Sequence, residues 1–283
     1  MALEPGILKG RTYLLGIGAQ KAGTTWLYEY LDAHPNIAMS PVKEMHFWGY
    51  RGCGPWEWPV THFRKRLRAR READAKSGVE RPYGPLRERI HMQGDVKLYR
   101  RFFRRRVTHE PVFGEITPAY AHLPAEEFAF INGHFARVKV VFLMRNPADR
   151  FWSQMRFSEN VETLEALEDR VDRCLAQTKY YERGDYARTL AHITGVFRRD
   201  QLFIEFYENL FSQTTLDRLC AFLAVPPHPG DFARRANVSV KMPLSPILRT
   251  RIARALRDQY IAADDAFDGS IPANWQADLA GLS

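Results

Sequence analysis

The residues Gly18 to Thr25, which read Gly-Ala-Gln-Lys-Ala-Gly-Thr-Thr, have the composition of a loop that binds an anionic group. Glycines let backbone N–H groups approach an anion closely, and a helix that starts behind such a loop adds partial positive charge. The ammonium of Lys21 and the hydroxyls of Thr24 and Thr25 would supply further donors. The segment therefore predicts a phosphate-binding loop. The alternative is a tight glycine turn that carries a surface lysine.

The same loop departs from the phosphate loop of nucleoside triphosphatases. Gly18 and Gly23 have the spacing of G-x-x-x-x-G-K-[ST], but Thr24 stands where the lysine is required. Those enzymes also place a carboxylate beyond a buried strand to hold Mg²⁺. Here the most apolar segment, Val138–Met144, is followed by Arg145. Both differences argue against metal-dependent phosphoryl transfer, and a nucleotide kinase with an unusual loop remains an alternative.

A second anion site is predicted from Arg145 and Ser153. Arg145 follows the apolar segment Val138–Met144, and Ser153 lies two turns into the helix expected after it. Ligands of parallel α/β sheets bind at the carboxyl ends of the strands. Together with the glycine loop, the two residues indicate a ligand with anionic groups at both ends. Taken singly, each could be an ordinary surface residue.

The elements that must position these residues alternate between strand and helix patterns. Strands are expected at Thr12–Gly18, Pro111–Ile116, Val138–Met144 and Gln201–Tyr207. Helices are expected at Thr25–Ala33, from Asn146 onward, and at Glu162–Thr178, Tyr186–Arg198, Thr215–Ala224 and Pro246–Tyr260. Asn146, Pro147 and Asp149 are typical of an N-cap, a first helical position and a first turn.

This alternation predicts an α/β fold with a central parallel sheet flanked by helices in a three-layer, P-loop-like arrangement. No low-complexity linker divides the chain, so we expect one domain over residues 1–283. An insertion is expected at about residues 52–92, in which Phe63–Asp74 could form a basic helix.

Composition excludes several classes of protein. The 283 residues are 45% hydrophobic and 26% charged, which is typical of a globular protein and not of a disordered one. The longest apolar runs are too short for a membrane-spanning helix, and Met1–Arg11 does not resemble a signal peptide. The three cysteines, Cys53, Cys174 and Cys220, predict free or buried thiols in a reducing, cytoplasmic compartment, with one disulfide as the alternative.

The net charge of +8 is concentrated in one segment. Between His62 and Arg106 there are 16 Lys and Arg against 5 Asp and Glu, so the rest of the chain is slightly acidic. This pattern predicts an anionic partner. Three interpretations are open: a solvated surface flap, an anionic-polymer binding module without enzymatic activity, or a segment that borders a substrate site and attracts an acidic acceptor.

Several motifs resemble those of the sulfotransferases that use 3′-phosphoadenosine 5′-phosphosulfate (PAPS). GAQKAGTTWLYEYLDAHP is similar to their 5′-phosphosulfate loop, and VVFLMRNPADRFWSQ is similar to their 3′-phosphate motif. The segments SPVKEMHFWG (Ser40–Gly49) and GEITPAY (Gly114–Tyr120) resemble the heparan-type, carbohydrate-modifying branch. FIEFYENL resembles the family's last strand, so the likeness covers most of the chain outside the insertion.

The resemblance implies a set of site residues and a donor. PAPS would be the donor and PAP (3′-phosphoadenosine 5′-phosphate) the product, with no metal. The 5′-phosphosulfate would be held by Lys21, Ala22, Gly23, Thr24, Thr25 and Trp26, and the 3′-phosphate by Arg145 and Ser153. Glu44 would be the general base, His46 an assisting histidine, and Lys21 the group that follows charge onto the leaving oxygen.

The sequence also departs from the heparan-type pattern. Ile116 stands where those enzymes often carry a lysine near the sulfuryl group, which speaks against a heparan-like acceptor. Their C-terminal Lys-Gly-Arg loop is missing, and Arg234, Arg235 or Lys241 could replace it. The acceptor is expected to be a small molecule or a carbohydrate, acidic or not, and no nucleic acid. The oligomeric state stays open.

The role of Glu44 rests on its neighbours. Met45, His46, Phe47 and Trp48 should bury its carboxyl and raise the pKa of Glu44 toward neutrality, which suits a general base. The alternative is a salt bridge between Glu44 and Lys43. His46 could equally be a core histidine among aromatic side chains.

Overall fold

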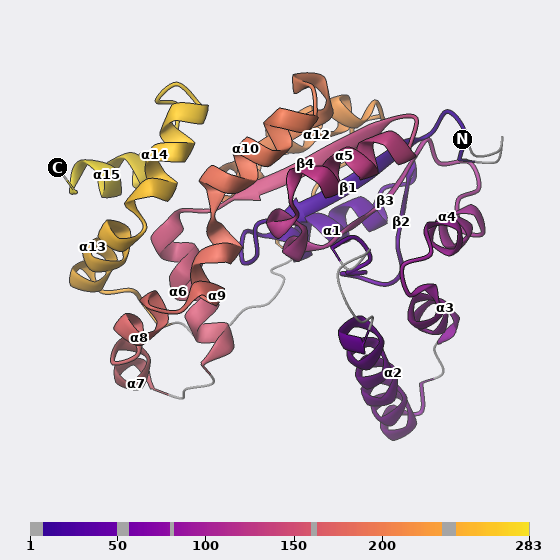
Figure 1. Cartoon of the computed structure of the whole chain (residues 1–283), viewed down its shortest axis with the longest axis horizontal. Helices are drawn as coiled ribbons and strands as arrows, with labels where there is room; N and C mark the ends of the chain where they lie inside the picture. The colour runs from indigo at the N-terminus through magenta and orange to yellow at the C-terminus, as the bar shows by residue number, and fades with distance from the viewer. Residues whose placement is uncertain (1–7, 50–56, 80–81, 160–162, 234–241, 283) are drawn as a thin grey trace.

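The computed structural model describes residues 8–49, 57–79, 82–159, 163–233 and 242–282. Five parallel strands form one sheet in the order β2-β3-β1-β4-β5. They are β1 (Thr12–Gly18), β2 (Ile37–Met39), β3 (Val112–Ile116), β4 (Val138–Met144) and β5 (Leu202–Phe206). Helices flank the sheet (Figure 1), so the predicted α/β architecture is confirmed.

The close pairing of the central strand β1 with β3 depends on a glycine. Gly114 of β3 lies against β1 so closely that a Cβ built on it would be 2.0 Å from the Leu14 carbonyl oxygen. A side chain there would force the two strands apart, because backbone atoms cannot move aside. The β3–β1 pairing therefore requires glycine at this position.

The sheet order places a ligand crevice at the carboxyl ends of β1 and β4. From β1 the chain runs through α1 (Thr24–Ala33) to β2, whereas β4 pairs with the opposite edge of β1. Such a reversal of direction is where open α/β sheets bind ligands. The Ala19 N–H donates to the Leu143 carbonyl at 2.6 Å, so the loop after β1 lies beside the end of β4.

The helix α6 (Pro147–Ser158) begins as the sequence predicts. Asn146 is its N-cap, and its side-chain oxygen accepts hydrogen bonds from the N–H groups of Ala148 and Asp149. The other helices that follow the insertion are α5 (Ala125–His134), α10 (Tyr186–Val196), α11 (Tyr207–Leu210), α12 (Gln213–Leu223) and α15 (Ala273–Ala280), with η1 (Pro118–His122), η2 (Glu182–Gly184) and η3 (Arg199–Gln201) as short 3₁₀ turns.

Two segments that were each predicted as one continuous helix are divided into shorter helices. The first, Glu162–Thr178, is divided into α7 (Leu164–Glu168) and α8 (Val171–Leu175), with α9 (Thr178–Tyr181) behind them. Donors from Arg170, Arg173 and Tyr180 converge on the buried Glu159 carboxylate, so the chain bends around it.

The second, Pro246–Tyr260, is interrupted at Leu256 between α13 (Pro246–Ala255) and α14 (Arg257–Ala266). The break lets the Tyr260 hydroxyl donate to Asn146 Oδ1 at 3.0 Å, so α14 supports the start of α6.

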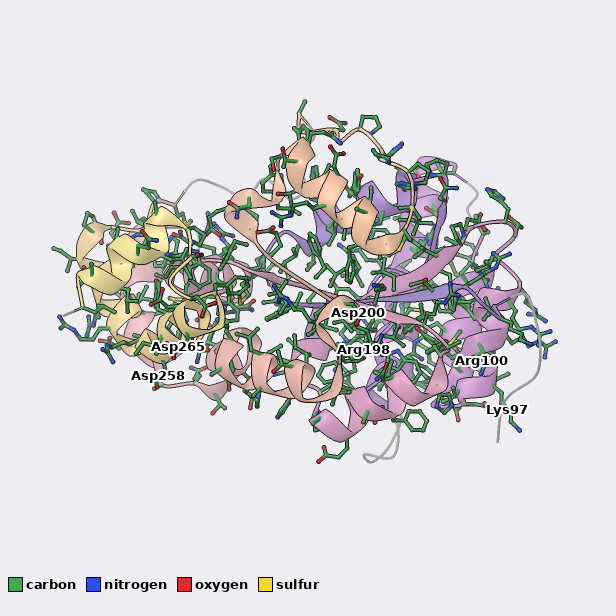
Figure 2. All side chains as sticks on the ribbon, turned by 90° about the horizontal axis from the view of Figure 1, so that it is seen from above. Lys97, Arg100, Arg198, Asp200, Asp258 and Asp265 are labelled. Atoms are coloured by element: carbon green, nitrogen blue, oxygen red, sulfur yellow. The ribbon has the colours of Figure 1, made fainter. Side chains whose placement is uncertain are left out.

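The insertion is helical. Its α2 (Glu57–Ser77) and α3 (Gly84–Met92) are followed by α4 (Val96–Arg104) at one end of the molecule (Figure 1). Seen from above, Lys97 and Arg100 of α4 lie at that end, and Asp258 and Asp265 of α14 lie at the other (Figure 2). The basic segment and the C-terminal helix α14 therefore lie at opposite ends of the molecule.

No helix within the described ranges is long and apolar enough to cross a membrane. Cys174 and Cys220 are buried free thiols, as expected, and Cys53 lies outside the described residues.

Candidate active site

The loop between β1 and α1 is closed against α11. Gly23 is the N-cap of α1 and has a left-handed φ of 84°. A Cβ on Gly23 would be 2.8 Å from Leu210 Cδ2 and 3.0 Å from the Tyr207 ring. Glycine is thus needed both for the backbone conformation and for the contact. The loop thus contacts β4 at one end and α11 at the other, and these contacts restrict its backbone.

The two predicted anion sites adjoin each other. The Arg145 guanidinium donates to the Lys21 carbonyl at 3.1 Å and lies over the Tyr207 ring, 4.6 Å from its centroid. The Lys21 ammonium lies 4.3 Å from the centroid of the Phe157 ring on α6. Lys21 and Arg145 therefore lie close together at the edge of the sheet where the sequence places them. The helix α6 also contacts Lys21, through Phe157.

The cations of this site repel one another. Burial, followed by the charges of Arg145, Arg156 and Lys43, lowers the pKa of Lys21, and only Glu44 acts in the opposite direction. Burial and Arg145 likewise lower the pKa of Arg156. Gathering like charges in a half-buried position destabilises the folded state unless an anion offsets them. The group of cations formed by Lys21, Arg145 and Arg156 therefore fits a ligand with several negative charges.

The remaining predicted donor-site residues differ in their surroundings. Ser153 is buried on α6, one turn before Arg156. Thr24 is buried, and the Thr25 hydroxyl accepts a hydrogen bond from the Lys43 ammonium at 2.6 Å. The Ala22 N–H donates to the Ala19 carbonyl at 3.2 Å, so this amide is engaged in the turn of the loop itself.

Trp26 lies in an aromatic stack at the start of α1. Its indole N–H donates to the Asp231 carbonyl at 3.3 Å. The rings of Tyr30 and Phe232 lie nearly parallel to it, at 4° and 17°, with centroids 6.0 Å and 5.9 Å away. Phe232 is 40% exposed, whereas Trp26 is 5% exposed. The flat face of Trp26 is therefore covered by a ring that is itself open to solvent.

Glu44 and His46 lie side by side, with His46 Nε2 3.6 Å from Glu44 Oε2, a distance at which a protonated imidazole forms an ion pair with a carboxylate. Both residues have left-handed backbone angles, φ 55° and 46°, which non-glycine residues adopt only when the surroundings hold them. The Tyr120 hydroxyl accepts hydrogen bonds from the N–H groups of Phe47 and Trp48. The loop that carries the two side chains is thus fixed from the η1 side.

The pKa of Glu44 differs from the expectation. Burial raises it, but the hydrogen bond and charge of His46 and the charges of Lys43 and Arg66 outweigh burial, so the pKa of Glu44 lies below its ordinary value. The prediction of a raised pKa was wrong because the sequence does not reveal how many cations face the carboxylate. Lys43, the alternative partner, donates its hydrogen bond to Thr25.

A second carboxyl, that of Glu115 on β3, holds this loop in place through Tyr120. It is fully buried and accepts hydrogen bonds from the hydroxyls of Tyr99, Thr117 and Tyr120. Burial raises the pKa of Glu115, and the three donors limit the rise. Since Tyr120 also holds the Phe47 amide, Glu115 orients the hydroxyl that fixes the Glu44 loop. Ile116 is buried in β3, where its side chain fills the space beside Gly16.

Arg89 of α3 holds the same loop from the insertion. Its side chain is fully buried, its Nε donates to the Met45 carbonyl, and its Nη2 donates to the His46 carbonyl at 2.7 Å. The guanidinium also lies 4.7 Å from the centroid of the Phe63 ring on α2. Two parallel donors on a planar group fix two successive carbonyls, which an ammonium cannot do. Arg89 is therefore a positioning residue for Glu44 and His46.

We expect Arg89→Lys to lower kcat by about tenfold to a hundredfold, because a displacement of the order of 1 Å in a catalytic group has effects of that size. KM for a ligand held at Lys21 and Arg145 should not change, because the two hydrogen bonds of Arg89 go to the Met45 and His46 carbonyls of the Glu44 loop. Steady-state kinetics check this, with Arg87→Lys, an exposed arginine of the same helix, as the matched control. A variant that is folded by circular dichroism and retains full kcat would contradict the positioning role.

Sequence reasoning named Lys43 only as a partner of Glu44, and it missed the other two cations that the fold brings to this site. Lys43 reaches Thr25, Arg66 of α2 donates to the Lys43 carbonyl at 3.0 Å, and Arg156 acts on Lys21. Arg156 could have been found, because it follows Ser153 by three residues and so shares its helix face. Arg66 could not, because nothing in the basic run distinguishes it from its neighbours.

Three predicted residues of the site have no described position. Arg234, Arg235 and Lys241, the candidates for a nucleotide-covering loop, lie outside the described residues. Within the described part of the chain, no group of three or more His, Cys, Asp or Glu could hold a metal ion.

Comparison with known proteins shows the family and the fold of the chain. The model of the sulfotransferase family matches residues 14–229, more than half of the chain. A sulfotransferase from Alicyclobacillus acidocaldarius has the same fold, with a TM-score of 0.62 and 22% identity over 94% of this chain and 99% of that one. The sulfotransferase domain of the Synechococcus PCC 7002 olefin synthase is more distant, with a TM-score of 0.45 and 17% identity over 99% of this chain and 95% of that one.

A search of curated proteins gave no significant match. Another similar solved structure is the sulfotransferase domain from the curacin biosynthetic pathway, with a TM-score of 0.44 and 16% identity over 80% of each chain. The heparan-type branch suggested by Ser40–Gly49 and Gly114–Tyr120 is not among these relatives. From the match over residues 14–229, the chain belongs to the sulfotransferase family.

Proposed function

We propose that the protein transfers a sulfuryl group from PAPS to a hydroxyl or amine of an acceptor and releases PAP. The observation that carries this proposal is that Lys43, the neighbour of Glu44, donates to the Thr25 hydroxyl at 2.6 Å, so the loop with the carboxylate adjoins the loop with Lys21. A polyanion and a proton acceptor would meet there. We also infer that the chain acts as one domain, with α2 and α3 as an insertion beside the site.

The donor would be held by residues from three elements. The loop amides at the start of α1, with Lys21, Thr24 and Thr25, suit the 5′-phosphosulfate, because a helix N-terminus and an ammonium both favour an anion. Arg145 and Ser153 suit the 3′-phosphate, with Arg156 one turn further along α6. Two phosphate groups on one ligand would offset the repulsion that lowers the pKa values of Lys21 and Arg156.

The aromatic stack suits the adenine ring of the donor. Flat aromatic rings separated by an intercalated base lie roughly 7 Å apart, since stacked rings are about 3.5 Å apart. Trp26 and Phe232 are already nearly parallel with centroids 5.9 Å apart, so a small outward movement of the exposed Phe232 would admit the base.

The chemistry requires a proton acceptor and a stabiliser of negative charge. Glu44 would take the proton from the acceptor hydroxyl as its oxygen forms a bond to sulfur. The bond between sulfur and the phosphate oxygen of the donor breaks, and the electron pair stays on that oxygen. Lys21 would stabilise the charge that develops there, since its ammonium belongs to the loop that holds this phosphate.

PAP should stabilise the protein in the presence of EDTA. At 100 times its dissociation constant, a ligand adds about 2.7 kcal/mol to the free energy of unfolding, which for a chain of this size raises Tm by several degrees. Arg145→Ala should reduce the shift with PAP more than the shift with adenosine 5′-phosphosulfate, which lacks the 3′-phosphate. Differential scanning fluorimetry measures both shifts.

The control is Arg137→Ala, which removes an exposed arginine at the opposite end of β4. This variant should respond to PAP as the wild type does. A wild type that is stabilised by ATP with Mg²⁺ and not by PAP would refute the proposed donor. Equal losses with both ligands in Arg145→Ala would remove Arg145 from the 3′-phosphate site.

A further inference from the structure

The three C-terminal helices meet at the turn between β4 and α6. Figure 1 shows α13, α14 and α15 grouped at the end of the molecule that is opposite to α2, α3 and α4. They follow residues 14–229, the part of the chain that matches the sulfotransferase family. The turn that they contact holds Arg145, the residue proposed for the 3′-phosphate, and Asn146. The C-terminal helices are therefore neighbours of the proposed donor site.

The backbone of Arg145 is held by one hydroxyl at both its N–H and its carbonyl. The Arg145 N–H donates to the Tyr186 hydroxyl at 3.0 Å, and that hydroxyl donates to the Arg145 carbonyl at 2.6 Å. Trp275 of α15 is fully buried and lies nearly parallel to the Tyr186 ring, at 22° with centroids 5.9 Å apart. Gln259 of α14 accepts a hydrogen bond from the Tyr186 N–H at 2.6 Å. Two C-terminal helices thus fix the residue that fixes the Arg145 backbone.

Asp278 of α15 determines which way the Asn146 carboxamide points. Its Oδ2 accepts a hydrogen bond from Asn146 Nδ2 at 2.7 Å. The Asn146 Oδ1 atom therefore faces the N–H groups of Ala148 and Asp149, from which it accepts as the N-cap of α6. A reversed carboxamide would place an NH2 group against these two N–H donors. The start of α6, directly after Arg145, is thus set by a carboxylate that lies 132 positions later in the chain than Asn146.

Arg249 of α13 holds Asp278 in this position. Its Nη1 donates to Asp278 Oδ2 at 2.8 Å, and its Nη2 donates to the Asp149 carboxylate in the first turn of α6. The Asp278 side chain is only 9% exposed. A nearly buried carboxylate with a charge-assisted hydrogen bond has little freedom to move. Asp278 is therefore a rigid link between α15, α13 and the turn that carries Arg145.

We propose that Asp278 is a positioning residue for Arg145, through which the C-terminal helices adjust the site to a nucleotide with a 3′-phosphate. The proposal rests on the proposed sulfuryl transfer from PAPS and adds a residue to its donor site. The Arg145 guanidinium lies over the Tyr207 ring and donates to the Lys21 carbonyl, so its position depends on the turn from which the side chain extends. A shift of that turn would move the guanidinium away from the 3′-phosphate. The loop at Gly23 contacts α11 instead, so the binding of the 5′-phosphate should persist.

The experiment measures the Kd of PAP and of adenosine 5′-phosphate, two nucleotides that differ only in the 3′-phosphate, by isothermal titration calorimetry. We expect Asp278→Ala to raise the Kd of PAP about tenfold, because a displaced guanidinium loses most of a charge-assisted hydrogen bond. The Kd of adenosine 5′-phosphate should not change. In Arg145→Ala, the additional change Asp278→Ala should raise the Kd of PAP no further, because the effect of Asp278 passes through Arg145.

The matched control is Asp258→Ala, which removes an exposed aspartate of α14 (Figure 2). This variant should keep the wild-type Kd of both nucleotides. Tyr186→Phe keeps the ring beside Trp275 and removes only the hydroxyl that holds the Arg145 backbone. It should show the same selective loss of PAP binding, and it tests the proposal if Asp278→Ala does not fold.

Three results would overturn the positioning role of Asp278. They are an unchanged Kd of PAP in folded Asp278→Ala, equal losses with PAP and adenosine 5′-phosphate, and additive effects of Asp278→Ala and Arg145→Ala. Failure of the proposed function would be visible in the wild type, before any variant is compared. A wild type that binds PAP no more tightly than adenosine 5′-phosphate would refute the 3′-phosphate site, and the positioning role with it.

Discussion

Replacing Lys21 with alanine should lower kcat by about 10²–10³ while the fold is retained. The size follows from the loss of one charge that stabilises the transition state in a half-buried site. The pKa of Lys21 is lowered by burial and by the charges of Arg145, Arg156 and Lys43. The charged Lys21 side chain is therefore electrostatically unfavourable in the folded protein. Removing it should therefore leave the stability unchanged or raise it, whereas a residue retained for stability would behave in the opposite way.

Three measurements distinguish these cases: kcat with saturating PAPS, Tm without ligand, and Tm with PAP. Lys97→Ala is the matched control, because Lys97 is an exposed lysine of α4 at the basic end of the molecule (Figure 2). We expect this control to keep wild-type turnover. Near-normal kcat in folded Lys21→Ala would exclude Lys21 from the reaction, and a large drop in ligand-free Tm would show that it is structural.

The elements that carry the donor site could be predicted because their signals are local. The strand Thr12–Gly18 is a short apolar run bounded by glycine, and Asn146 with Pro147 marks a helix start by hydrogen-bonding capacity and fixed φ alone. The carboxyl ends of parallel strands must meet at one edge of the sheet. For that reason the contact between Lys21 and Arg145 also followed from the sequence.

The parts that were mispredicted depend on contacts between distant residues. The interruption at Leu256 serves a hydrogen bond from Tyr260 to Asn146, more than 100 positions earlier in the chain. Arg89 binds the Met45 and His46 carbonyls from the insertion, where the sequence predicted a basic helix at Phe63–Asp74 and no role for Arg89. Local propensity carries no information about such pairs, so tertiary contacts decide the outcome.

The electrostatic surroundings of Glu44, the proposed general base, differ from the expectation. Met45, Phe47 and Trp48 are buried, but the Glu44 side chain is itself 38% exposed, so the expected burial of its carboxyl is only partial. The effect of burial on the pKa of Glu44 is outweighed by His46, Lys43 and Arg66, two of which reach the carboxylate from neighbouring positions and one from α2. A carboxylate in such surroundings is ionised at neutral pH without any substrate, which changes the expected pH dependence.

Changing Glu44 to glutamine should reduce kcat by about 10²–10⁴, the usual contribution of a general base. The side chain keeps its shape and loses its ability to accept a proton. Binding of PAP should change little, since the donor residues lie on other elements, and removal of a negative charge next to Lys21 should strengthen it slightly. Kinetics and PAP titration test this, with Glu126→Gln, an exposed carboxyl of α5, as control. Equal loss of turnover and of PAP binding would make Glu44 a structural residue.

The pH profile of the wild type gives an independent test of the same assignment. The acid limb of kcat/KM reports the pKa of the free enzyme's base. Because the pKa of Glu44 lies below its ordinary value of 4.5, the carboxylate form persists as pH falls from 7 to 5, and activity that depends on it should not decline over that interval. The limb should appear only below 4.5. In His46→Asn, the effect of His46 that lowers the pKa of Glu44 is lost while burial still raises it, so the limb should move upward. A limb that stays in place in His46→Asn would mean that another group accepts the proton.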